Sequence, residues 1–352
     1  MMRRSLWCAL CGLLAVAALT LAVPAAFAST NPLELHPAPP ASNPLVGARW
    51  FVNPDDDAQR QMRYWEQTGQ TDLADIIAKL ADEPQTEHFG SFTTHIRTDL
   101  RTYLHLVRRG TVPIIATYDL PHLGCAHTSD TPAQSLAFRD WIHAFAHTIG
   151  RHRAVIFLEE DALITIGCLS PSGLAVRMSE LAYATRVLGR LPHAVTYLDA
   201  GAADGDPSPR RIAHLLRLAG VANIRGFFLN CTHFDWTSHE LSYGNRVARI
   251  LHTHFVVSTS VNGRGPLHPP DRHQNGNEIL CNPPGRGLGP RPTTDTGDPL
   301  ADAFMWIAIA GRSGGECHPG DPPNGDWFPT YAVELAYNAN SQLGPGDPSQ
   351  PY

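Results

Sequence analysis

Acidic and small polar residues follow directly after the apolar segments of this sequence. They are Tyr118-Asp119, Glu159-Glu160-Asp161, Asp199, Asn230 and Ser258-Thr259-Ser260. The sequence shows neither the Ser-His-Asp order of a nucleophilic triad nor a Gly-rich phosphate loop, so this set favours acid–base chemistry on a neutral polar substrate. Each acidic residue could instead cap the helix that follows it, and this alternative stays open. The functional interpretation is stronger for Asp161 than for Asp199.

Two other patterns could bind a metal or a nucleotide. His143 and His147 are four residues apart in a helical segment, but they lack the H-E-x-x-H pattern, and the 18 histidines are spread widely. A solvated or packing role is therefore favoured for them. Residues 263–266 contain two glycines but do not open a helix, so the nucleotide interpretation is weak. The sequence predicts no cofactor and no metal.

The elements that must position these residues alternate between strands and helices. The predicted strands are residues 49–52, 113–118, 154–158, 194–198, 225–230, 254–258 and 303–309. The predicted helices are residues 57–68, 72–80, 96–109, 134–149, 174–188, 209–219, 238–252 and 331–338. Strands that are apolar throughout are typical of parallel sheets covered on both faces. Repeated strand–helix alternation predicts an α/β fold, either a barrel or a doubly wound sheet, as a single domain.

In such folds the carboxyl ends of the strands gather at one edge, where chemistry concentrates. The polar residues named above all stand at those ends. Residues 261–299 break the alternation, because they are rich in Gly and Pro and show no periodicity. A loop of this length inside a compact domain is usually functional.

Composition excludes several classes of protein. The chain has 352 residues, of which 43% are hydrophobic and 17% charged, and this excludes a disordered chain. The net charge of −6 gives no basic surface for a nucleic acid or an anionic membrane. We therefore expect no nucleic acid as partner.

The N-terminus has the pattern of a secretory signal. Arg3 and Arg4 precede an apolar stretch at residues 6–23, and residues 26–28 read Ala-Phe-Ala, a cleavage pattern. An uncleaved membrane anchor is the alternative. We expect a signal peptide at 1–28, a Pro-rich tether at 29–42, the folded domain at 43–342 and a tail at 343–352. The mature protein would be secreted, with no membrane association after cleavage.

The cysteines fit an exported protein. Two of the seven lie in the predicted signal, and the other five are Cys125, Cys168, Cys231, Cys281 and Cys317. Four of these can form two bridges, with Cys231 left over, although spacing alone does not fix the pairing. The mature chain has no C-x-x-C pair, which argues against structural zinc.

Several ordered motifs resemble glycoside hydrolase family 6, the cellobiohydrolases and endoglucanases that invert β-1,4-glucan linkages. The matching segments are 43–45 with 51–54 (Asn-Pro-Leu and Phe-Val-Asn-Pro), 118–121 (Tyr-Asp-Leu-Pro), 158–163, 197–201, 225–230 and 281–298. Together they extend from about Asn43 to Asn340. The resemblance implies a distorted (β/α) TIM-like barrel whose substrate groove is roofed by long loops.

The resemblance also implies roles for four residues near the reacting bond. Asp161 takes the place of the general acid that protonates the glycosidic oxygen. Tyr118 matches the tyrosine beneath the reacting sugar, and Ser129 lies where a serine helps to hold the attacking water. Asp199 matches a buried carboxylate near the acid.

Three further positions match residues that bind the sugar. Phe51 corresponds to an aromatic platform, and Asn53 and Asn230 to polar contacts. The resemblance also pairs Cys125 with Cys168 and Cys281 with Cys317. The expected partner is a β-glucan or a cello-oligosaccharide, and we expect a monomer.

This sequence departs from the family at positions that carry charge or aromatic rings. Gly124 replaces an Asp that tunes the acid, and Ala308, Arg312 and Gly314 replace Lys, Glu and Asp. Aromatic or His side chains are replaced by Ala202, Gly205 and Leu280. An inverting site needs a second group roughly 6.5–9.5 Å from the acid. Loss of the carboxylate at position 124 also removes like-charge support for a raised pKa of Asp161.

Two functions follow from these departures. The first is a secreted β-1,4-glucan hydrolase with weak or altered activity, in which Asp119, Glu160 or Asp130 replaces the missing base. The second is a catalytically degenerate barrel that binds a glycan or has no enzymatic role. An exported barrel without any sugar function is the remaining alternative.

Overall fold

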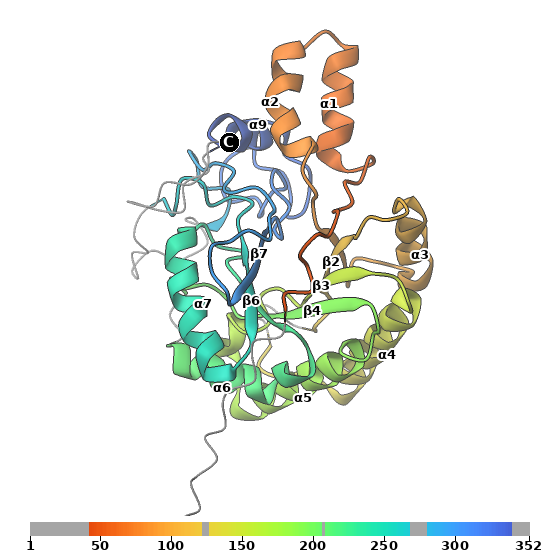
Figure 1. Cartoon of the computed structure of the whole chain (residues 1–352), viewed down its shortest axis with the longest axis vertical. Coiled ribbons are helices and arrows are strands. Elements are labelled where there is room, and N and C mark those ends of the chain that lie inside the picture. The colour runs from red at the N-terminus through yellow and green to blue at the C-terminus, as the bar shows by residue number, and fades with distance from the viewer. Residues whose placement is uncertain (1–41, 122–126, 206–207, 268–279, 340–352) are drawn as a thin grey trace, which may run out of the picture. The chain divides into compact units, whose positions relative to one another are not determined.

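The computed structural model describes residues 42–121, 127–205, 208–267 and 280–339, and its folded unit begins at Asn43. Seven parallel strands form one sheet in which each strand pairs with the next along the chain (Figure 1). They are β1 (Glu87–Gly90), β2 (Ile114–Tyr118), β3 (Ala154–Leu158), β4 (Ala194–Asp199), β5 (Gly226–Leu229), β6 (His254–Ser258) and β7 (Ala301–Met305). Within the described residues β1 and β7 do not pair, so the sheet curls into a half-barrel.

Helices between successive strands cover the outer face of the sheet, and three further helices lie before β1 or after β7 (Figure 1). In chain order the helices are α1 (Asp57–Gln67), α2 (Thr71–Ala81), α3 (Ile96–Leu106), α4 (Pro132–Ile149), α5 (Pro171–Leu188), α6 (Pro209–Leu218), α7 (Thr237–Leu251) and α9 (Pro329–Tyr337). Short 3-10 turns lie at Thr165–Cys168 and Val221–Asn223. The α/β barrel type predicted from the sequence is confirmed.

Three helices start with the same local signal. Thr131, Ser170 and Ser208 each accept a hydrogen bond at the N-cap of a helix that begins with proline. The hydroxyl satisfies one of the free N–H groups of the first turn, and proline has no N–H there to satisfy. At α4 the side chain of Gln134 completes a capping box. These starts fix where each helix leaves the loop at the carboxyl end of the preceding strand.

The core has two layers separated by the sheet. Alternate strand residues, such as Ile115, Ile156 and Leu198, pack with the helices on the outer face. The residues between them, such as Ala116 and Phe157, pack with one another inside the curl. Both faces are therefore buried, which explains why the strand segments are apolar throughout.

The strand predictions are confirmed except at the two ends of the sheet, where the strand predicted at 303–309 is β7 at Ala301–Met305. The predicted strand at 49–52 makes only a single bridge, between Trp50 and Val112. The first strand of the sheet is instead β1, which the sequence analysis missed because four residues with only one large apolar side chain show no clear alternation. The predicted long loop has no helix or strand within residues 261–267 and 281–299. Among the described residues no helix has the length and apolar character needed to span a membrane.

The cysteine predictions fare differently. Cys281 and Cys317 form a disulfide. Cys168 is also disulfide-bonded, while Cys125, its expected partner, lies outside the described residues. Cys231 is free and buried.

Candidate active site

Asp161 lies just beyond β3, between side chains from the carboxyl ends of β2 and β5. The hydroxyl of Tyr118, the last residue of β2, donates to Asp161 Oδ2 over 3.4 Å. Thr232, after β5, donates to Oδ1 over 3.0 Å. Parallel strands bring these residues together because their carboxyl ends share one edge of the sheet. The site expected at Asp161 and Tyr118 is thus assembled at the carboxyl ends of β2, β3 and β5.

The backbone around Asp161 is held in an unusual conformation. Glu159 and Asp161 have φ values of 53° and 65°, in the left-handed region that side chains rarely adopt. Glu159 is fully buried, and its carboxylate accepts hydrogen bonds from the Thr117 hydroxyl and from the N–H groups of Asp119 and Leu120. The side chain therefore ties the end of β3 to the end of β2. Strain of this kind persists only where surrounding contacts enforce it, and it concentrates at functional sites.

The loop that presents Thr232 is fixed by Asn230. Its φ is 67°, and its amide donates to the carbonyls of Asp235 and Ser258 over 3.0 and 3.1 Å. The side-chain oxygen Oδ1 of Asn230 accepts the N–H of Asp235 over 3.1 Å. These bonds close a tight loop at residues 230–235. Thr232 is therefore held in place against Asp161.

Burial makes the carboxyl groups of this site hard to ionise. It raises the pKa of Asp161, and the charge of Glu160 raises it further, while Thr232, His233 and Tyr118 oppose the shift. Asp199 is 2% exposed, and burial together with Asp161 holds its pKa well above the ordinary value. Asp199 accepts the N–H groups of Gly201 and Leu163 over 3.2 and 3.4 Å. A protonated Asp161 above a buried Asp199 is a suitable proton donor.

Glu160 supplies the like charge that the sequence analysis considered lost with position 124. Its Oε1 lies 2.8 Å from His88 Nε2, and the other ring nitrogen of His88 faces the carbonyl of Thr86 at 3.2 Å. Burial lowers the pKa of His88, but Glu160 outweighs this effect, so the net pKa is raised. Both ring nitrogens thus face acceptors, as they do in an imidazolium.

Three other predicted residues lie on the loops around this edge of the sheet. The Ser129 hydroxyl is half-buried and donates to the carbonyl of Asp130 over 3.3 Å. Asp130, which lies just before α4, interacts with Arg177 and Glu180 of α5. Burial and the charge of Glu159 raise the pKa of Asp119 to about 7.

Two of the three expected sugar-binding residues are buried, and the third is half-buried. Phe51 is 2% exposed, and its ring packs edge-on against Tyr103 with centroids 5.9 Å apart, so it offers no free face to a sugar. Asn230 is 1% exposed and its amide is used within the loop that it closes. Asn53 is half-buried and donates to Glu87 over 3.3 Å.

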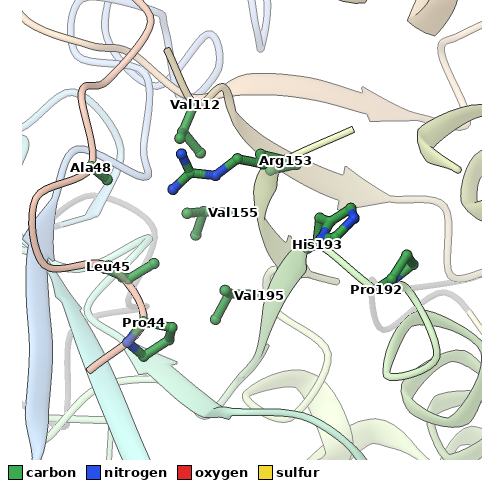
Figure 2. Close-up of a pocket in the computed structure, with 11 residues that line it drawn as sticks. Pro44, Leu45, Ala48, Val112, Arg153, Val155, Pro192, His193 and Val195 are labelled. Carbon is green, nitrogen blue, oxygen red and sulfur yellow. The ribbon is translucent and has the colours of Figure 1, made fainter. Parts of the chain in front are cut away.

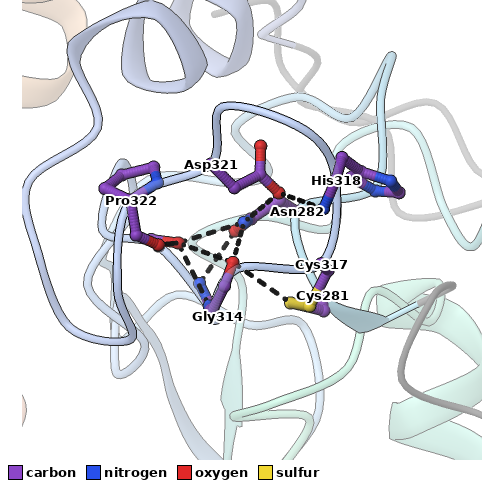
Figure 3. Close-up of a disulfide and its surroundings, with 9 residues drawn as sticks. Cys281, Asn282, Gly314, Cys317, His318, Asp321 and Pro322 are labelled. Carbon is purple, nitrogen blue, oxygen red and sulfur yellow. Dashed lines mark hydrogen bonds between the residues drawn. A yellow bond between two sulfur atoms is a disulfide. The ribbon is translucent and has the colours of Figure 1, made fainter.

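The segment around the Cys281–Cys317 disulfide is held by Asn282. Its amide donates to Ser313 Oγ, to the carbonyl of Gly315 and to Asp321, over 2.8–3.0 Å, and its oxygen accepts the N–H of Gly314 (Figure 3). Gly314 itself adds no side chain. The two nitrogens of Arg312 lie 2.8 and 2.9 Å from Asp57, so this arginine is bound to α1.

A separate cavity of about 230 Å³ opens at the amino ends of β2, β3 and β4. Figure 2 shows its apolar lining, which includes Leu45, Val112 and Val155, with the Arg153 guanidinium group beside them. This cavity lies at the edge of the sheet remote from Asp161. It carries none of the residues expected to act in catalysis.

The sequence analysis missed the supporting residues of the site. Glu159 was included only as one of three adjacent acids, and nothing in its spacing indicates that its carboxylate braces the backbone. His88 belongs to the strand that was not predicted. Thr232 stands two residues after a predicted site residue, and that proximity was the available signal.

Comparisons with known proteins agree with this geometry. The family model "Glycosyl hydrolases family 6" matches residues 45–339. Endoglucanase A of Thermobispora bispora is 33% identical over 332 residues, which cover 90% of this chain and 66% of that protein. Endoglucanase 1 of Streptomyces halstedii is 32% identical over 332 residues, with 90% and 95% covered. The chain thus spans about two thirds of the first relative and nearly all of the second.

Solved structures give the same result. The endoglucanase Cel6 from Mycobacterium tuberculosis, in complex with a thio-linked methyl cellobiosyl-cellobioside, is 33% identical with a TM-score of 0.76, covering 84% of this chain and 99% of that one. The cellobiohydrolase Cel6A core from Chaetomium thermophilum is 23% identical with a TM-score of 0.69, covering 85% and 99%, and shows a shared fold. With motifs, fold and relatives in agreement, this chain belongs to glycosyl hydrolases family 6.

Proposed function

We propose that this protein hydrolyses β-1,4-glucosidic bonds of cellulose-type glucans, with inversion at the anomeric carbon and with low activity. The observation that carries the proposal is the setting of Asp161, a carboxyl with a raised pKa between two hydroxyl groups at the carboxyl edge of the sheet. Family relatives named as endoglucanases support the substrate class. The Mycobacterium relative carries a cello-oligosaccharide analogue, which supports a cello-oligosaccharide as the ligand here.

The proposed reaction begins with proton donation. Asp161 in its protonated form gives its proton to the glycosidic oxygen, and Tyr118 and Thr232 stabilise the carboxylate that results by hydrogen bonds. The charge of Glu160, which is hydrogen-bonded to His88, raises the pKa of Asp161 before the reaction. This charge takes over the tuning role that the residue at position 124 has in the family.

Water activation is the weaker half of the proposed mechanism. A water molecule must attack the opposite face of the sugar ring and lose a proton to a second group. The family supplies a carboxylate at the position of Gly314, where this chain presents only a backbone N–H bound to Asn282. Asp119, whose pKa is about 7, Glu160 and Asp130 remain the candidate bases. We attribute the expected low activity to this side of the site.

The assay is hydrolysis of a soluble cello-oligosaccharide by the purified chain, with the product anomer followed by NMR. We expect slow release of the α-anomer and a loss of about 10²- to 10⁴-fold in Asp161→Asn. Asp140→Asn, an exposed carboxylate on α4, is the matched control and should keep the rate. A β-anomeric product would contradict inversion, and equal rates in both variants would remove Asp161 from the mechanism.

The second candidate function is glycan binding without hydrolysis. It is favoured by the glycine at position 314, which supplies no carboxylate to activate water. Calorimetric binding of cello-oligosaccharides by a chain that releases no product would support this function. We further propose that the protein is exported. The proposal rests on the N-terminal pattern and on the Cys281–Cys317 disulfide, because disulfides persist in oxidising compartments.

A further inference from the structure

Three carboxylates meet beside the loop that carries Thr232. Asp204 comes from the loop after β4, Asp235 from the loop after β5 and Glu240 from the first turn of α7. One ligand oxygen of each lies within 4.8 Å of those of the other two. Asp235 and Glu240 are 3% and 0% exposed, so water screens these charges poorly.

One oxygen of this group has no partner. Glu240 Oε1 accepts the N–H of Ala203 over 2.8 Å, but the buried Oε2 meets no donor among the described residues. A buried carboxylate oxygen without a donor is costly, so a proton or a cation must satisfy it. Burial and the charges of Asp235 and Asp204 oppose the ionisation of Glu240 and hold its pKa well above the ordinary value.

Nearby positive groups do not complete the site. His233 Nδ1 lies 2.8 Å from Asp204, and His239 Nδ1 lies 2.6 Å from Asp235. No ion pair with Lys or Arg reaches the three carboxylates in the described part of the chain. Even with both histidines protonated, three carboxylates would carry one charge more than their partners. Glu240 is the carboxylate of the three that has no histidine partner among the described residues.

We propose that Asp204, Asp235 and Glu240 bind a calcium ion. Calcium takes carboxylate oxygens at 2.3–2.6 Å, so ligand oxygens up to about 4.8 Å apart can surround it. Magnesium binds at 2.0–2.1 Å and would need a more compact set. The two histidines would act on the outer oxygens of Asp204 and Asp235, as groups beyond the first ligands commonly do. The Asp204 side chain is 10% exposed, which gives water and the ion a route to the site.

Binding at this position would stabilise the active-site loop. Asp235 is joined through its backbone to Asn230, and Thr232 between them donates to Asp161. A calcium ion would hold the loop after β5 to the loop after β4 and to α7. This inference goes beyond the proposed function, and its binding readout does not depend on catalysis.

The test uses the full chain after removal of metals by a chelator. We expect added CaCl₂ to raise Tm by several degrees, with one ion bound per chain by equilibrium dialysis and metal analysis, and MgCl₂ to act far more weakly. Glu240→Gln mimics a protonated Glu240. It should lose the calcium response while Asp140→Asn keeps it.

A proton in place of the ion gives the opposite pattern. In that case CaCl₂ leaves the Tm of the wild type unchanged, and Glu240→Gln is as stable as the wild type; this result overturns the proposal. A calcium response that survives in Glu240→Gln also overturns it, because the ion would then bind elsewhere. If Glu240→Gln fails to fold, Asp204→Asn at the more exposed position replaces it in the same comparison.

Discussion

Two regions of the molecule carry family motifs, and they are built by different means. The acid region, at the carboxyl ends of β2, β3 and β5, rests on buried strands and on carboxylates that bind backbone N–H groups. The disulfide region, residues 281–287 and 311–328, has no strand or helix and is held by the disulfide and by Asn282. The acid region keeps its chemical groups. The disulfide region keeps its framework, and Gly314 lies where we propose that a family carboxylate is missing.

The difference shows that the residues that hold a loop in place can be distinct from the residues that react. In the acid region, Glu159 and Asp199 bind the backbone as well as shaping the pKa of their neighbours, so their loss would disturb the fold. In the disulfide region the structural bonds run through Asn282 and the cysteines. The framework of this region therefore does not depend on a carboxylate side chain at position 314.

The largest expected effect on stability concerns the framework of the disulfide region. Cys281 and Cys317 are 36 residues apart, and the double variant Cys281→Ser/Cys317→Ser should lose about 3–4 kcal/mol of unfolding free energy in the chain-entropy model. Cys231→Ala, in the acid region, removes only one buried sulfur and should lose about 1 kcal/mol. Denaturant unfolding measures both. Equal losses would break the comparison, because the disulfide region would then not depend on its bridge.

The next effect concerns the missing chemistry. A Cβ at Gly314 would meet Cys281 no closer than 3.4 Å, which is ordinary contact, so Gly314→Asp should fold. We expect it to raise the hydrolysis rate about tenfold or more by restoring a second carboxylate. Arg312 needs no change, since it is bound to Asp57.

The neighbouring glycine is the matched control. Gly315 has φ 135°, so Gly315→Asp is strained and should lower Tm without any gain in rate. A well-folded Gly314→Asp protein with the wild-type rate would show that the loss of activity does not originate at this position.

A smaller effect separates structural from catalytic carboxyls. Burial raises the pKa of Asp56 to about 7, against about 4 in the unfolded chain. Between these values the folded state binds the proton and the unfolded state does not, so stability is lost as the pH rises from about 4 to 7. Asp56→Asn keeps the N-cap of α1. It should flatten this slope and stabilise the protein by about 1 kcal/mol at pH 8 in thermal unfolding.

The same measurement tests the acid region. Burial raises the pKa of Glu159 to about 7 as well, but Glu159→Gln halves the acceptors available to Leu120, Asp119 and Thr117. It should flatten the slope and still lose stability at every pH. Identical behaviour of the two variants would contradict a bracing role for Glu159.

The smallest effect sharpens the role of Glu160. Its charge raises the pKa of Asp161, so Glu160→Gln should lower that pKa. The acid must be protonated to act, and the alkaline limb of the pH–rate profile should therefore move to lower pH, with the rate at low pH changed little. An unmoved limb in Glu160→Gln would exclude this tuning.

Much of the fold could be predicted because local signals and burial agree. The strand at His254–Ser258 and the helix that begins at Pro209 were predicted from their apolar residues, whereas α5 begins at Pro171, three residues before its predicted start. The strand Glu87–Gly90 could not be predicted, because its order comes from pairing with β2 rather than from its own residues. Tertiary pairing also explains why residues 49–52 form a single bridge only.

The candidate site could be predicted only in part. Asp161 and Tyr118 were found through motifs at strand ends, and the structure brings them within hydrogen-bonding distance. The contacts of Glu159 and His88 depend on the left-handed turn at residues 159–161 and on the position of β1, and neither is encoded in residue spacing. Phe51 differs from these residues, because its motif predicted a sugar platform and its ring packs in the core against Tyr103.

The half-barrel leaves a seam between its first and last strands. Within the described residues, the hydroxyl of Thr86 donates to the carbonyl of Trp306 over 2.8 Å across this seam, without a ladder of backbone hydrogen bonds. Backbone amides of β1 should therefore exchange with deuterium sooner than those of β3, which is paired on both sides. Opening of the barrel would start at this seam and leave the strands that support Asp161 intact.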